Sequence, residues 1–123
     1  MTLLLVLAGG VIGAPLRYLT DLLVQSRHDS VFPWGTFIVN VAGSLVLGLV
    51  QGAVRRGALP ASVVVFVGTG ICGALTTFST FGFETVRLLE EGSIATAVAN
   101  ALGSLAAGLA AGAAGWALIT AVV

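Results

Sequence analysis

The apolar residues of this chain fall into four long runs separated by short polar stretches. The polar stretches at 25–33, 55–60 and 90–92 carry most of the charged residues. The hydrocarbon core of a bilayer is about 30 Å thick, so a helix needs roughly 20 apolar residues to cross it. The pattern therefore predicts an all-α integral membrane protein with a single domain, residues 1–123. Its four transmembrane helices are expected at 3–24, 34–54, 61–89 and 93–123.

Composition supports the membrane interpretation and narrows the function. Hydrophobic residues make up 58% of the chain, charged residues 8%, and the mean hydropathy is +1.11. Soluble domains carry about 25% charged residues, so no room is left for a soluble catalytic domain and we expect no enzyme. The net charge is zero and no basic patch is present, which argues against nucleic acid as a partner. The expected location is the cell membrane, crossed several times.

The first apolar run is similar to a signal peptide at first sight. It has no positively charged start, and its apolar stretch continues past Arg17. We therefore expect it to remain as the first transmembrane helix.

Positive charges near the helix ends are balanced between the two sides of this topology. Arg55 and Arg56 would lie on the side of both termini, and Arg27 and Arg87 on the other side. An excess of Lys and Arg on one side normally fixes the orientation, and this chain has no such excess. Balanced charges permit insertion in both orientations and lead to the hypothesis of an antiparallel homodimer. The alternative is a single orientation chosen by a weak bias.

The third apolar run changes character near its middle. Glycines at 68, 70 and 73 are followed at 76–81 by hydroxyl and aromatic residues. Such a sequence weakens a helix, and a break would free backbone carbonyl groups, which transporter folds use to hold Na⁺. A break on the two-fold axis of a dimer would assemble a cation site from the carbonyl groups of both copies. The alternative is a kinked but uninterrupted helix.

Two phenylalanines follow the expected break. Phe78 and Phe81 are three residues apart and project to nearly the same face of a helix. Their ring edges carry partial positive charge that can attract an anion without fixing it. Ser79, Thr80 and the amide of Asn40 would add hydrogen-bond donors, so the set suits a small anion that must pass without sticking. Two phenylalanines at this spacing are also compatible with ordinary packing.

Three motifs resemble those of the CrcB/Fluc family of fluoride channels, and the resemblance covers essentially the whole chain. They read GAPLRY at 13–18, GTFIVNVAGS at 35–44, and GALTTFSTF at 73–81 followed by Glu84. The TTFSTF core of the third motif is the most specific part. The resemblance implies an antiparallel, dual-topology homodimer with two fluoride pores and a central Na⁺ that is structural and not transported.

The resemblance also implies roles for single residues. The Na⁺ ligands would be the backbone carbonyl groups of Gly73 and Thr76, and Arg17 would lie at a pore entrance. The fluoride pore would be lined by five residues: Asn40, Phe78, Ser79, Thr80 and Phe81.

One feature departs from the family pattern. Many members carry a tyrosine in the fourth helix, whereas the only tyrosine here is Tyr18, in the first. Asn100, four residues before Ser104, is the nearest substitute because its amide can also donate a hydrogen bond. Asn100 and Ser104 are therefore expected at the pore or its vestibule. The family also includes heterodimers, so a paired homologous subunit is an alternative to a second copy.

These features predict a passive channel that exports cytoplasmic fluoride and lowers its toxicity. The chain shows no ATP-binding motif and no relay of carboxylates. A first alternative is a coupled transporter similar to the small multidrug resistance exporters, but those place a glutamate in the first helix, where this chain has none. A second alternative is a non-transporting membrane scaffold subunit. Cys72 has no basic neighbour to activate it, which argues further against an enzyme.

Overall fold

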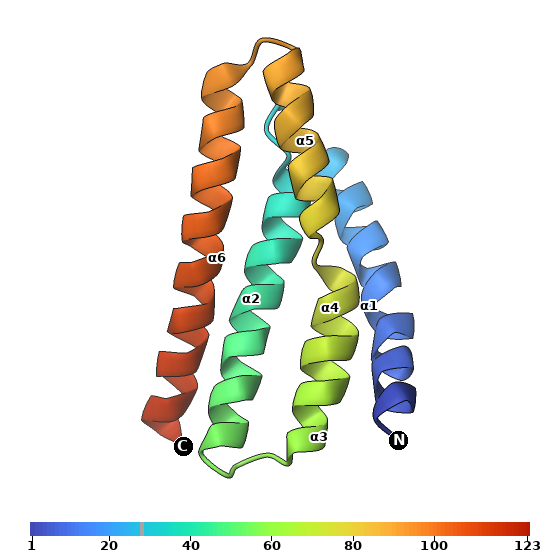
Figure 1. Ribbon diagram of the computed structural model, residues 1–123, viewed down its shortest axis with the longest axis vertical. Coiled ribbons are helices and arrows are strands. Elements are labelled where there is room, and N and C mark those ends of the chain that lie inside the picture. Colours follow the sequence, from blue (N-terminus) through green and yellow to red (C-terminus); the bar gives the residue numbers. More distant parts are fainter. Residues whose placement is uncertain (28) are drawn as a thin grey trace.

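The computed structural model describes residues 1–27 and 29–123, and all the regular secondary structure of these residues is helical (Figure 1). Four spans are long and apolar enough to cross a membrane, which confirms the predicted fold class. Their bounds differ from the predicted ones by one residue at most. The spans are α1 (Thr2–Gln25), α2 (Trp34–Arg55), the third span Ala61–Glu90, and α6 (Ile94–Val122).

Both termini lie at one end of the bundle, beside the link between the second and third spans (Figure 1). The other two links lie at the opposite end, as four crossings require. The turns that follow the helices ending at Arg55 and Glu90 each contain a glycine with positive φ. These are Gly57, with φ of 79°, and Gly92, with φ of 80°. Glycine adopts this left-handed conformation without steric cost, so both links can be short.

The third span is built from several helical pieces. It begins with α3 (Ala61–Val63), widens into the π-helical segment η1 (Val64–Cys72), and returns to α-helix in α4 (Gly73–Leu75). Thr76 and Thr77 are extended, with ψ values of 160° and 125°, and α5 (Phe78–Glu90) follows. The third span as a whole is bent by about 23°. The predicted break near the middle of the span is confirmed, and the uninterrupted helix is wrong.

Glycines let the helix backbones approach closely within two pairs of spans. Between α2 and α6, a Cβ on Gly48 would collide with the carbonyl oxygen of Gly112, and one on Gly115 with that of Leu45. Between α1 and η1, a Cβ on Gly9 would lie 2.7 Å from the Cα of Gly70. In lipid, such close contact replaces the hydrophobic effect as the force between helices. The glycines therefore set the positions of the helices that carry the break.

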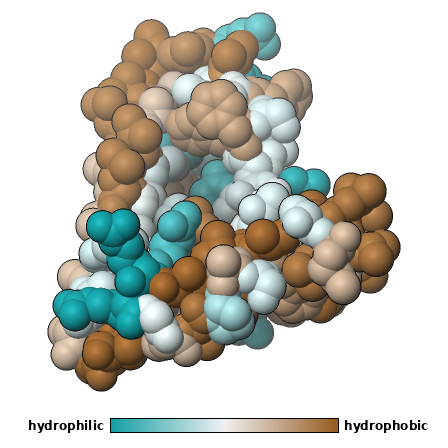
Figure 2. All heavy atoms as spheres, turned by 60° about the horizontal axis from the view of Figure 1, so that its bottom comes forward, coloured by the Kyte–Doolittle hydropathy of each residue, from teal (hydrophilic) through white to brown (hydrophobic). Residues whose placement is uncertain are grey.

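The outer surface is that of a membrane protein. Figure 2 shows hydrophobic side chains over most of the visible face and a hollow between two ridges. Large apolar side chains such as Leu3, Leu102 and Leu109 are 64 to 68% exposed. A soluble protein does not expose so much apolar surface. The chain is a multi-pass membrane protein.

Candidate functional site

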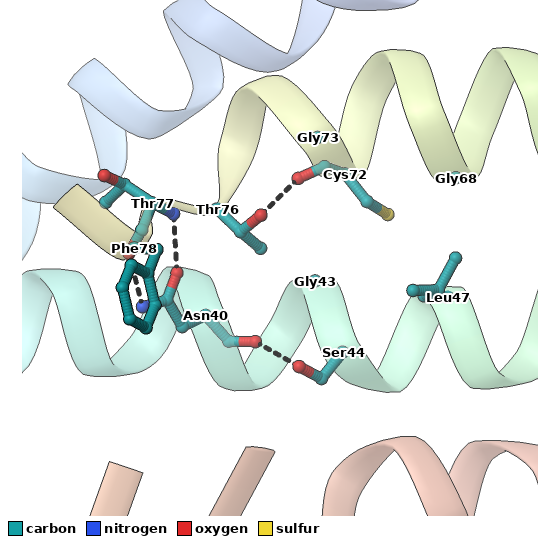
Figure 3. A pocket seen from close by; sticks show the side chains of 10 residues that line it. All are labelled: Asn40, Gly43, Ser44, Leu47, Gly68, Cys72, Gly73, Thr76, Thr77 and Phe78. Atoms are coloured by element: carbon teal, nitrogen blue, oxygen red, sulfur yellow. Dashed lines mark hydrogen bonds between the residues drawn. The ribbon is translucent and has the colours of Figure 1, made fainter. Parts of the chain in front are cut away.

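Asn40 on α2 holds the break in the third span by two hydrogen bonds (Figure 3). The backbone N–H of Thr77 donates to Oδ1 of Asn40 at 2.8 Å, and Nδ2 of Asn40 donates to the carbonyl oxygen of Thr77 at 3.0 Å. The amide thus pairs with the backbone of Thr77 as a neighbouring strand would. It satisfies the N–H of Thr77, which the broken helix would otherwise leave unpaired inside the membrane, and it gives the carbonyl group of this N-cap residue a further hydrogen bond.

The same bonds release two backbone carbonyl groups. In a continuous α-helix, the N–H of Thr77 would donate to the carbonyl of Gly73, and that of Thr80 to the carbonyl of Thr76. Instead, the Thr77 N–H donates to Asn40, and the Thr80 N–H donates to Oγ1 of Thr77 at 3.2 Å. The carbonyl groups predicted for a cation, those of Gly73 and Thr76, are therefore among those that lose their regular helical partners at the break.

Three hydroxyl groups gather where α5 begins. Thr77 caps the helix through the bond from the Thr80 N–H, and its Oγ1 donates to Oγ1 of Thr80 at 3.1 Å. Oγ of Ser79 lies 3.3 Å from Oγ1 of Thr77. Ser79 and Thr80 are both exposed in the single chain. The predicted hydroxyl pair thus lies beside the break, with Thr77 as a third member.

Phe78 and Phe81 lie together at the start of α5, with ring centroids 5.9 Å apart and planes inclined by 49°. They border a groove of about 290 Å³ between α2, α5 and α6. Phe78 is 85% exposed in the single chain, whereas Phe81 is half-buried. The residues that line the groove, called the phenylalanine groove below, are Asn40, Ser44, Phe78, Phe81, Ser104, Leu105, Gly108 and Leu109.

Arg17 lies on the other side of α2, away from this groove. It lines a second cavity of about 270 Å³ together with Tyr18 and Asp21 of α1, Thr36 of α2, and the hydroxyl residues Thr77 and Thr80. The two cavities thus meet the broken third span from different sides. The structure brings Arg17 near Thr80 and not near the phenylalanine rings.

Two further contacts of this region were not anticipated from the sequence. Thr36, which is 7% exposed, donates to Oε1 of Glu84, and so ties α2 to α5. Thr85 donates to the carbonyl oxygen of Phe81 at 2.8 Å and accepts from Nδ2 of Asn100 at 2.8 Å. Thr85 follows Phe81 by one helical turn, so its spacing is the only signal in the sequence that could have pointed to it.

The two α6 residues predicted for the pore differ in position. Ser104 lines the phenylalanine groove. Asn100 is 1% exposed, and its amide lies between Thr85 and Ser104, whose hydroxyl donates to Oδ1 at 3.1 Å. Ser104 therefore reaches the groove directly, whereas Asn100 reaches it only through Ser104.

The fold and the site together define a class: a small multi-pass membrane protein with a groove at a break in its third span, lined by two phenylalanines and a few polar side chains. The chain belongs to the family described as CrcB-like protein, Camphor Resistance (CrcB), whose pattern matches residues 4–116.

Similar proteins carry an explicit name. The chain is 59% identical to "Fluoride-specific ion channel FluC 1" of Frankia casuarinae over 99% of this chain and 98% of the relative. It is 58% identical to the protein of the same name from Streptomyces avermitilis, over 94% and 93% of the two chains. A third protein of that name, from Thermobifida fusca, is 44% identical over 97% and 96%. The likeness therefore spans all four helices and the break.

Proposed function

We propose that this chain is a fluoride channel that lets the anion leave the cell passively and so lowers its toxicity. The observation that carries the proposal is the phenylalanine groove beside the helix break, in a chain similar over nearly its full length to proteins named fluoride-specific ion channels. The relatives are named as channels, which supports a transport function for this chain. No energy source is required, because an anion held at higher concentration inside leaves down its own gradient.

The groove offers attraction without a fixed positive charge. Fluoride is small and strongly hydrated, so a pore must replace its water with donors or with the positive edges of aromatic rings. The side chains of Phe78 and Phe81 supply ring edges. An asparagine amide carries two protons on nitrogen, and the bond to Thr77 uses one, which leaves the second for the groove that Asn40 lines. Such contacts bind weakly enough to allow exit.

The working unit in this proposal is an antiparallel homodimer, with a paired homologous subunit as the alternative partner. In one copy, Phe78 is 85% exposed, and the phenylalanine groove, with Asn40 and two serines in its lining, is open beside the break near the middle of the third span. Lipid cannot satisfy polar backbone and side-chain groups at that depth, so protein must cover them. The arginines are balanced between the two ends of the helices, so neither orientation in the membrane is favoured. This balance supports a second copy inserted in the opposite orientation.

A structural Na⁺ completes the proposal. Na⁺ is a hard cation that suits carbonyl oxygen ligands, and the carbonyl groups of Gly73 and Thr76 have lost their regular helical partners. Two such groups from each copy would provide four oxygen ligands. The ion would neutralise the partial negative charge of the carbonyl groups and so fix the break, without taking part in transport.

Fluoride efflux from liposomes tests the function directly. Purified protein is reconstituted into vesicles loaded with potassium fluoride, valinomycin carries the counter-charge, and a fluoride electrode records release. We expect rapid release of fluoride and little release of chloride under matched conditions. Vesicles that retain fluoride, while a fluorescent reporter shows the protein inserted and folded, would exclude the channel. A partner that co-purifies with such inactive protein would favour the scaffold subunit.

A further inference from the structure

A chain of four hydrogen-bonding groups runs from the phenylalanine groove into the protein between α5 and α6. It begins at Ser104 in the groove, continues through the buried amide of Asn100 and the hydroxyl of Thr85, and ends at the carbonyl oxygen of Phe81. The three bonds measure 3.1, 2.8 and 2.8 Å. This series of hydrogen bonds therefore connects the Ser104 hydroxyl, in the groove, with the backbone of Phe81, one of the two groove phenylalanines.

The direction of the protons along this chain is fixed by its last member. The carbonyl oxygen of Phe81 can only accept, so the single proton of Thr85 must point at it. Thr85 is then an acceptor for Asn100, which must present its NH₂ group to Thr85 and its oxygen to Ser104. Because that oxygen can only accept, Ser104 must donate its single proton to Asn100. What Ser104 presents to the groove are lone pairs.

From this order we infer that Asn100 is a positioning residue that withholds the proton of Ser104 from an anion in the groove. The inference rests on the proposed function. To donate to fluoride, Ser104 must turn its proton away from Asn100, a residue that is 1% exposed and whose side-chain oxygen would lose that donor. Leaving a buried acceptor without its partner lowers an equilibrium constant by about 5- to 150-fold. Ser104 therefore holds fluoride weakly, and the anion leaves readily.

Substitution of Asn100 should expose the effect. Asn100→Leu removes the competing acceptor at similar volume and frees the Ser104 proton for the groove. We expect the fluoride concentration for half-maximal efflux to fall about tenfold and the maximal rate to fall as well, because a tightly held anion leaves slowly. Thr85→Val, which removes the group that orients the amide, should shift both quantities in the same direction. Thr85→Ser keeps the hydroxyl and should restore the behaviour of the unmodified protein.

A double-mutant cycle separates this role from a purely structural one. In a Ser104→Ala background, Asn100→Leu should leave the half-maximal concentration unchanged, because there is no proton to release. Thr120→Val is a matched control, since that hydroxyl also lies on α6 but donates to backbone carbonyl oxygens of its own helix, those of Trp116 and Ala117. Equal shifts in both backgrounds would overturn the inference, as would no shift in folded Asn100→Leu and Thr85→Val proteins.

The outcome also distinguishes this inference from the proposed function. If the unmodified protein releases fluoride but the cycle shows no coupling, the channel stands and the role of Asn100 falls. If the unmodified, folded protein releases no fluoride, both fall together.

Discussion

Replacing Asn40 with aspartate is the most direct test of the groove. The substitution preserves the shape of the side chain and the oxygen that accepts from the Thr77 N–H. It exchanges the nitrogen for a carboxylate oxygen, which would face the carbonyl oxygen of Thr77 where the present bond measures 3.0 Å. It also removes the second N–H and adds a negative charge to a groove that is proposed to carry an anion.

The size of the effect follows from these two changes. Two unit charges 4 Å apart interact by about 4 kcal/mol at an effective dielectric constant of 20, which corresponds to about a thousandfold in rate. The lost hydrogen bond of the Thr77 carbonyl contributes about 1 kcal/mol more. A passing fluoride lies farther than 4 Å from Asn40 for part of its path. We therefore expect Asn40→Asp to lower efflux by about 100- to 1000-fold.

Liposome efflux with the fluoride electrode measures the rate of Asn40→Asp directly. Two further variants separate the effect of the added charge from that of the lost donors. Asn40→Leu removes the donors without adding charge, so its rate should lie between those of the unmodified protein and Asn40→Asp. Gln51→Glu makes the same amide-to-carboxylate change on α2 at an exposed residue outside the phenylalanine groove, and its rate should stay within about twofold of normal. Normal efflux through folded Asn40→Asp protein would refute the assignment of Asn40 to the fluoride path.

Three further predictions address the rings, the cation and the helix packing. Phe81→Ile removes a ring edge from the groove and should lower efflux at least about tenfold in the liposome assay, whereas Phe83→Ile, on the same helix but outside the groove, should change little; equal effects would argue against a specific role of Phe81. Replacing Na⁺ on both sides of the vesicles with a large organic cation should reduce efflux reversibly, and an unchanged rate would contradict the carbonyl-bound ion. In Gly115→Leu the new side chain would collide with the Leu45 carbonyl and should destabilise the protein by about 3 kcal/mol or more. The control Gly103→Leu, on the same helix, places its side chain in open space and should have little effect. Thermal unfolding in detergent compares the two variants.

The sequence predicted the elements of this site well because the elements are local. Apolar run lengths determine the four spans, and glycines followed by hydroxyl residues at 73–80 identify the break. The partners across helices could not be read in the same way. The bonds between Asn40 and the Thr77 backbone join residues 37 positions apart. They form only at one axial position of α2 relative to the third span. Helical spacing gives a face but not that register.

The same limit applies to the glycines and the polar residues of α6. Gly103 and Gly115 are both glycines of this helix, yet of the two it is Gly115 that lies against a neighbouring backbone. Asn100 was expected as a direct donor to the pore because its amide can donate. The structure gives both ends of that amide to protein partners, Thr85 and Ser104. Whether a polar group is free to bind a ligand depends on its other bonds, which sequence spacing does not reveal.

The bonds inside the phenylalanine groove bear on how a channel can attract fluoride without trapping it. Besides Ser104, the groove contains Ser44, whose hydroxyl donates to the carbonyl oxygen of Asn40 at 2.8 Å. Both serine protons are thus already bonded, and either must break a protein bond before it donates to an anion. The remaining attraction comes from one amide N–H and two ring edges, which cost nothing to use. A groove built this way replaces part of the water of fluoride while keeping every individual contact weak, which is the condition for rapid exit.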